Sequence, residues 1–103
     1  MKVNILGIEY KIIFIESNEK LEESGNLEGL CDMFNKEITI KRSNNKKHED
    51  TVLRHEIIHA FLYECGLDVC SWGRNEEIVD WIALQLPKIN DACNNILREL
   101  NDE

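Results

Sequence analysis

Two histidines inside an apolar helix restrict the structure of this chain more than any other part of its sequence. His55-Glu56-Ile57-Ile58-His59 lies in a segment, Val52 to Cys65, whose apolar residues surround most of a helix. Residues four apart share one side of an α-helix, about 6 Å apart along its axis. Two imidazoles and a carboxylate among apolar side chains are destabilising unless a partner satisfies them. The fold must therefore supply that partner.

A metal ion is the partner that these residue types fit best. Both imidazoles can reach one cation, and zinc binds imidazole nitrogen at about 2.0–2.1 Å. Glu56 projects from nearly the same face, where it can accept a proton from a metal-activated water instead of binding the metal. We therefore predict His55 and His59 as zinc ligands and Glu56 as general base. In a chain with only 3 histidines this spacing is a specific signal, although two histidines on a solvated helix would need no metal.

A catalytic zinc site usually has three protein ligands and an open position for water. Cys65 is a weak candidate for the third ligand, because no glycine ends the helix early enough to bring it back to the metal. The acidic start of the next helix, Asn75-Glu76-Glu77-Ile78-Val79-Asp80, is a better source. Helical phase alone leaves Glu76 and Glu77 open. Asp80 favours Glu76, because it lies four residues later on nearly the same face and could hold a ligand histidine.

These residues resemble the gluzincin class of zinc metallopeptidases, whose pattern is H-E-x-x-H followed on a later helix by N-E-x-x-x-D. Asn75, Glu76 and Asp80 match the second part position by position. The resemblance implies Glu76 as third ligand and Asp80 as the hydrogen-bond partner of a ligand histidine. At this size the chain is similar to minimal gluzincins and to the small phage-associated ImmA/IrrE-like metallopeptidases. That similarity implies a zincin-like fold over most of residues 1–86 and a cytoplasmic regulatory protein, such as a repressor, as substrate.

One part of the gluzincin pattern has no counterpart here. Larger gluzincins place a His or Tyr beyond the glutamate helix to stabilise the tetrahedral oxyanion, and this sequence has neither after Tyr63. Tyr63, one turn after His59, is therefore the candidate transition-state stabiliser, although a packed aromatic is the commoner role for such a residue. His48, about 10 Å along the helix axis from His55, is expected at the surface.

Strand patterns precede helical patterns, which predicts an α+β fold. Short β-branched stretches predict a small antiparallel sheet of about four strands, packed on the H-E-x-x-H helix. Two hairpins should form it, one turning at Leu6-Gly7 and the other at Asn35-Lys36, with a charged loop over Glu16–Glu28 between them. The strands are expected at Val3–Ile5, Ile8–Ile15, Leu30–Phe34 and Glu37–Lys41.

Two helices complete the expected fold. The first follows the N-cap candidates Ser43-Asn44-Asn45 and ends at Gly66. The second carries an apolar stripe with steps of three or four residues, and Pro87 inside it predicts a kink or a break. That stripe consists of Ile78, Ile82, Leu86, Ile89, Cys93, Ile96 and Leu100. A chain of 103 residues is expected to form a single domain, residues 1–103.

Charge and cysteine content narrow the cellular setting. A net charge of -8 argues against nucleic acid and anionic membrane surfaces as partners. No apolar run is long enough to span a membrane, and Glu9 and Lys11 interrupt the apolar core that a signal peptide would need. We therefore expect a cytoplasmic protein. In that reducing compartment the four cysteines should be free thiols: Cys31, Cys65, Cys70 and Cys93.

The favoured interpretation is a zinc-dependent endopeptidase that hydrolyses peptide bonds through a metal-activated water, with Glu56 as general base. The backbone of the peptide or protein substrate would pair with a free sheet edge, at Leu30–Phe34 or Glu37–Lys41. The alternative is a catalytically idle or latent zinc-stabilised interaction module, which the missing electrophile and the long C-terminal helix would suit. An acidic mimic of nucleic acid would leave the H-E-x-x-H motif unexplained. The sequence predicts no oligomeric state.

Overall fold

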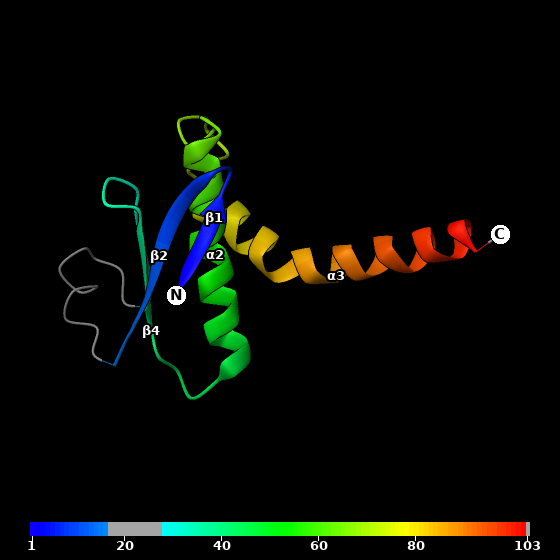
Figure 1. The fold of residues 1–103 in the computed structure, drawn as a ribbon, viewed down its shortest axis with the longest axis horizontal. Coiled ribbons are helices and arrows are strands. Elements are labelled where there is room, and N and C mark those ends of the chain that lie inside the picture. Colours follow the sequence, from blue (N-terminus) through cyan, green and yellow to red (C-terminus); the bar gives the residue numbers. More distant parts are fainter. Residues whose placement is uncertain (17–27, 103) are drawn as a thin grey trace.

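The computed structural model describes residues 1–16 and 28–102, which form a mixed four-stranded sheet and two helices (Figure 1). The predicted α+β class is confirmed. The predicted charged loop falls mostly outside the described residues. The elements are β1 (Lys2–Ile5), β2 (Ile8–Ile15), β3 (Gly29–Asp32), β4 (Glu37–Lys41), α2 (Lys46–Glu64) and α3 (Glu76–Asn101).

The first hairpin forms where the sequence predicts it. β1 and β2 pair antiparallel, with Ile5 opposite Ile8, so Leu6 and Gly7 alone make the turn. Both residues have positive φ, 53° and 90°, which is the backbone of a type I′ turn. The Asn4 side chain accepts a hydrogen bond from the Gly7 amide at 2.7 Å.

The prediction of an entirely antiparallel sheet is wrong. β3 and β4 form the expected antiparallel hairpin, but β4 then pairs parallel to β2, which gives the strand order β1-β2-β4-β3. This arrangement places β4 in the middle of the sheet, where Ile38, Thr39 and Ile40 are all buried. The alternation of residues along a short segment predicts a hairpin. How two hairpins pair with each other depends instead on which strand can be buried on both of its faces.

The second hairpin also turns earlier than predicted. β3 ends at Asp32, whose carboxylate accepts hydrogen bonds from the amides of Phe34 and Asn35. Phe34, expected in a strand, is 95% exposed. Within the predicted turn pair Asn35-Lys36, Lys36 takes a positive φ of 57°. The Asp32 side chain therefore sets this turn.

α2 packs lengthwise against the sheet, with both ends as predicted. Asn45 is the N-cap and accepts a hydrogen bond from the His48 amide. At the other end Gly66 has a φ of 83°, and the Leu67 amide donates to the Leu62 carbonyl at 2.8 Å, which is a Schellman cap. The core between helix and sheet is formed by Ile5, Tyr10, Ile12, Ile38, Ile40 and Ala60.

α3 contacts α2 only through its first half. Val79 and Ala83 are its buried residues, and the Arg54 guanidinium of α2 donates to the Ala83 carbonyl at 2.9 Å. From Lys88 onward every described residue of the helix is exposed, and Figure 1 shows this half extending away from the sheet and α2. The helix passes through Pro87 without a break. Within the described residues neither helix has the length and apolarity of a membrane span.

Candidate metal centre

The side chains predicted to bind a metal converge between α2 and the first turn of α3. His55 and His59 lie one turn apart on α2, and Glu76 is the first residue of α3. One donor atom from each lies within 4.8 Å of the others, and this is the group of metal-ligating side chains that stands out among the described residues. Asn75 caps α3 by accepting hydrogen bonds from the amides of Glu77 and Ile78. That cap fixes the point at which Glu76 enters the site.

The spacing of the donor atoms matches the coordination shell of a small cation. The two Nε2 atoms of His55 and His59 are 3.0 Å apart. Glu76 Oε2 is 2.8 Å from His55 Nε2, and Glu76 Oε1 is 3.1 Å from His59 Nε2. Ligands about 2.0–2.1 Å from a tetrahedral zinc ion would lie about 3.3 Å from one another. Two imidazole nitrogens and a carboxylate that face each other this closely fit the needs of a divalent cation.

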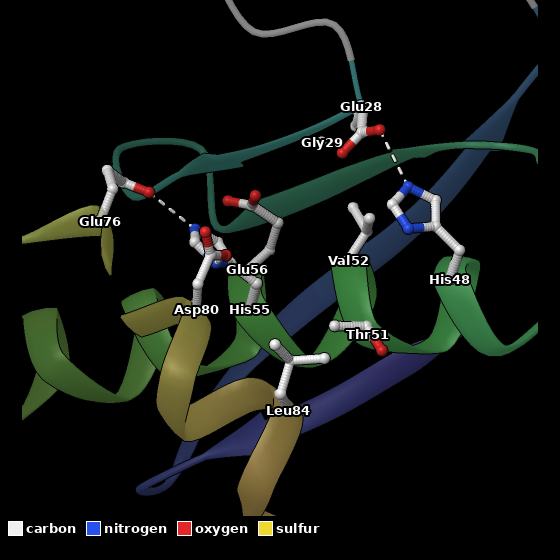
Figure 2. A pocket seen from close by; sticks show the side chains of 10 residues that line it. All are labelled: Glu28, Gly29, His48, Thr51, Val52, His55, Glu56, Glu76, Asp80 and Leu84. Atoms are coloured by element: carbon white, nitrogen blue, oxygen red, sulfur yellow. Dashed lines mark hydrogen bonds and ion pairs between the residues drawn. The ribbon is translucent and has the colours of Figure 1, made fainter. Parts of the chain in front are cut away.

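Asp80 lies behind the first histidine. Its Oδ1 is 2.6 Å from His55 Nδ1, on the side of the ring away from the other two donors. The contact is not aligned as a hydrogen bond, and His55 Nδ1 is the buried side-chain atom among the described residues that lacks a hydrogen-bond partner. A negative charge at this distance favours a proton on Nδ1, which leaves Nε2 free to bind a metal. Figure 2 shows Asp80 and Glu76 of α3 facing His55 of α2.

Glu56 lies beside the donor cluster without belonging to it. Its side chain is buried, with 5% of the residue exposed, and Figure 2 shows the carboxylate directed toward the strand that contains Gly29. Burial raises the pKa of Glu56 to about 7; the nearby His55 lowers this pKa, whereas Glu76 and Asp80 raise it. A carboxyl group that titrates near neutrality can accept a proton and release it again, which is what general-base chemistry needs.

Two hollows open on either side of the cluster. The larger is a cleft of about 390 Å³ between α2, the start of β3 and α3 (Figure 2). The second, of about 240 Å³, lies toward the other end of β3. His55, Glu56 and Glu76 line both hollows. The remaining lining residues are Glu28, Gly29, His48, Thr51, Val52, Asp80 and Leu84 in the cleft, and Leu30, Cys31, Met33 and His59 in the second hollow.

β3 connects these two hollows. It is the last strand in the sheet order, so its outer side carries no further strand within the described residues. Cys31 on this strand is not a thiolate at neutral pH, because burial raises its pKa to about 12. The thiol beside the cluster therefore stays uncharged.

Four other residues considered from the sequence lie outside the donor cluster. Tyr63 lines neither hollow, and the Lys36 ammonium lies 4.9 Å from the centre of its ring. Cys65 ends α2, where its thiol donates to the Leu62 carbonyl. Glu77 follows Glu76 on α3 but is absent from the donor cluster. His48 lines the far end of the cleft, with Nε2 2.8 Å from Glu28 Oε1.

Part of the cleft lining could have been predicted and part could not. Thr51 and His48 precede His55 by four and seven residues, so helical phase places all three on one face of α2. Leu84 follows Asp80 by four residues in the same way. Gly29 carries no side-chain signal, and only the packing of β3 against α2 brings it to the site.

Comparisons with protein-family models, curated proteins and solved structures found no match to this chain. The site is therefore interpreted from its own residues.

Proposed function

We propose that this chain is a zinc-dependent endopeptidase with a zincin-like fold of the gluzincin type. His55, His59 and Glu76 would hold the metal, with Asp80 orienting His55. The observation that carries the proposal is the convergence of three donor atoms, 2.8–3.3 Å apart. Beside them lies the buried carboxylate of Glu56, which is not one of the donors. A structural metal site would not need Glu56, whereas a hydrolytic site needs a base at that position.

When bound, zinc would polarise the scissile carbonyl and a water molecule. Glu56 accepts one proton from that water while the water oxygen adds to the carbonyl carbon. The same carboxyl group then gives the proton to the departing nitrogen as the C–N bond breaks. Burial raises the pKa of Glu56 to about 7 in the metal-free chain, and the charge of a bound cation would lower this pKa, which favours the carboxylate form that accepts the proton. Cleavage yields a carboxylic acid and an amine, and the second proton of the water passes from the acid to the amine, which leaves a carboxylate and an ammonium group.

The substrate would bind as an extended peptide along β3. β3 is an edge strand of the described sheet, and a peptide that pairs along such a strand is recognised through its backbone and selected through side chains in the adjoining hollows. Four carboxyl groups line the cleft, so basic segments would be preferred: these are Glu28, Glu56, Glu76 and Asp80. The phage-associated resemblance suggests a cytoplasmic regulatory protein such as a repressor.

The decisive experiment compares zinc content and peptide cleavage in Glu56→Gln and Glu77→Gln. We expect one zinc per chain in both variants, cleavage of a peptide library by Glu77→Gln, and loss of cleavage by at least a hundredfold in Glu56→Gln. Chelation should lower the thermal midpoint of the unmodified protein, because a ligand that binds only the folded state stabilises it. Absence of metal by elemental analysis would contradict the proposal, as would unchanged cleavage by Glu56→Gln.

A second candidate is a zinc-stabilised interaction module that is catalytically idle. The observation in its favour is the position of Tyr63 at Lys36, which leaves both hollows without a tyrosine hydroxyl to stabilise an oxyanion. Stoichiometric zinc without cleavage of any peptide would favour this function. Equal cleavage by Tyr63→Phe and the unmodified protein would show that the reaction does not use this hydroxyl.

A further inference from the structure

The distal half of α3 carries a row of apolar side chains that touches nothing else in the described chain. Every residue from Lys88 to Asp102 is exposed, and the molecule measures 54 Å along its longest axis because this half extends outward (Figure 1). The exposed fractions are 43% for Ile89, 54% for Ile96 and 58% for Leu100. A soluble helix that packs on nothing normally has no such row, so these side chains require a partner.

The spacing of the row identifies the kind of partner. The apolar positions advance by four, three, four, three and four residues, without interruption across Pro87. This is the seven-residue repeat of a coiled-coil seam, in which a second helix lies along the row. The seam continues the row of the distal half, Ile89, Cys93, Ile96 and Leu100, back to Leu86 and the half-buried Ile82.

We propose that the partner is the same helix of a second copy of this chain, in antiparallel orientation. A twofold axis near Asp91 places Ile82 opposite Leu100, Leu86 opposite Ile96, and Ile89 opposite Cys93 of the other copy. Each of the six apolar positions then has an apolar partner. A seam that is complementary to itself in this way is what a symmetric homodimer requires.

The charges on the helix permit this pairing. The positions that flank the seam carry one charged residue, Glu99, which faces Gln85 of the second copy in the antiparallel arrangement. Asn90 faces Asn90, and no like charges meet. The other charged side chains from 85 to 102 lie on the outer side of the helix: Lys88, Asp91, Arg98 and Asp102.

The net charge selects the antiparallel orientation over the parallel one. Each chain carries a net charge of -8, of which -6 lies in residues 1–81, before the seam. A parallel pair would bring these acidic bodies together, whereas an antiparallel pair of about 20 residues separates them by about 30 Å. That distance exceeds the Debye length of about 8 Å at physiological salt. The seam has fewer than three heptads, so we expect a weak dimer with Kd in the micromolar range.

Sedimentation velocity of the full chain from 1 to 200 μM at physiological salt tests this inference. We expect a concentration-dependent shift from monomer to dimer. Ile96→Glu should weaken dimerisation at least tenfold, because it places a carboxylate inside the seam. Asn95→Glu adds the same charge on the neighbouring outer face and should leave the shift unchanged. Circular dichroism would establish that both variants are folded, which is expected because residues 95 and 96 are exposed.

Orientation is tested separately with the Ile89→Cys variant. Mild oxidation with oxidised glutathione should link position 89 of one copy to Cys93 of the other, as identified by peptide mapping. A Cys93–Cys93 link in the unmodified chain would overturn the antiparallel arrangement. A monomer at 200 μM, or equal dimerisation by Ile96→Glu, would overturn the dimer itself. Neither outcome depends on zinc or on peptide cleavage, so the proposed function stands or fails independently.

Discussion

Replacing Gly29 by alanine should destabilise this protein, although its backbone would accept alanine readily. Gly29 begins β3 directly above α2, and its φ lies outside the left-handed region. A Cβ built on it would lie 2.9 Å from Val52 Cγ1 and 3.1 Å from both Cγ and Oε2 of Glu56. The first contact is closer than side chains allow, and a β-branched valine in a helix has one strongly preferred rotamer with which to respond.

Two opposing effects determine the size of the change. Forcing a methyl group into a packed site typically costs about 1–3 kcal/mol. Removing a glycine where alanine fits the backbone favours folding by about 0.4–1 kcal/mol, because the unfolded chain loses freedom. We therefore expect Gly29→Ala to lower the free energy of unfolding by about 1–2 kcal/mol. With zinc bound, cleavage should also fall, because the methyl group displaces the Glu56 carboxylate.

Urea unfolding followed by circular dichroism, arranged as a double-mutant cycle with Val52→Ala, measures this effect. If the clash with Val52 is the cause, Gly29→Ala should be neutral or stabilising in the Val52→Ala background. Equal cost in both backgrounds would refute the steric explanation. A neutral Gly29→Ala in the unmodified protein would show that β3 and α2 are less closely packed than described.

Three further outcomes are expected. With the metal chelated, the stability that neutral Glu56 provides is fully present below pH 4.5 and is lost as the pH rises through about 7. The free energy of unfolding of Glu56→Gln should therefore rise by about 2 kcal/mol relative to that of the unmodified protein between pH 5 and 8.5. Urea titrations that give parallel pH curves for the two proteins would contradict this expectation. Zinc affinity, measured by competition with a chelating dye, should fall at least tenfold in Glu76→Gln and little in Glu77→Gln. In Asp80→Ala it should fall about 10–100-fold. The reverse order for the two glutamates would assign the ligand role to Glu77. Gly66→Ala should lower the thermal midpoint by a few degrees, since a φ of 83° costs alanine about 1–2 kcal/mol, and an unchanged midpoint would mean that the helix end rearranges.

Features set by neighbouring residues could be predicted from the sequence. The turn at Leu6-Gly7, the cap at Asn45 and the helix end at Gly66 each depend on a few consecutive residues, and each is confirmed. The pairing of β2 with β4 depends on residues more than 20 positions apart, and hairpin patterns do not encode it. A kink at Pro87 stays a prediction.

The same distinction applies to the site. His55 and His59 follow from helical spacing within one segment, so the sequence alone brings them together. The prediction that Glu76 contacts both histidines also used the resemblance to gluzincins, because this contact depends on how α3 packs on α2. Glu28 and Gly29 were not predicted, since their position reflects the sheet order and not any local pattern. Tyr63 as transition-state stabiliser stays a prediction.

The division of the donor cluster between two helices couples the cluster to local unfolding. Within α3 only Val79 and Ala83 are buried, so the helix is held to the rest of the molecule by a small contact. Separation of α3 from α2 is therefore expected to need less free energy than unfolding of the sheet. A cation bound by His55, His59 and Glu76 has to release Glu76 before α3 can leave. Bound metal would thus slow the exchange of α3 amide hydrogens with solvent and leave the exchange of β4 amides governed by global unfolding.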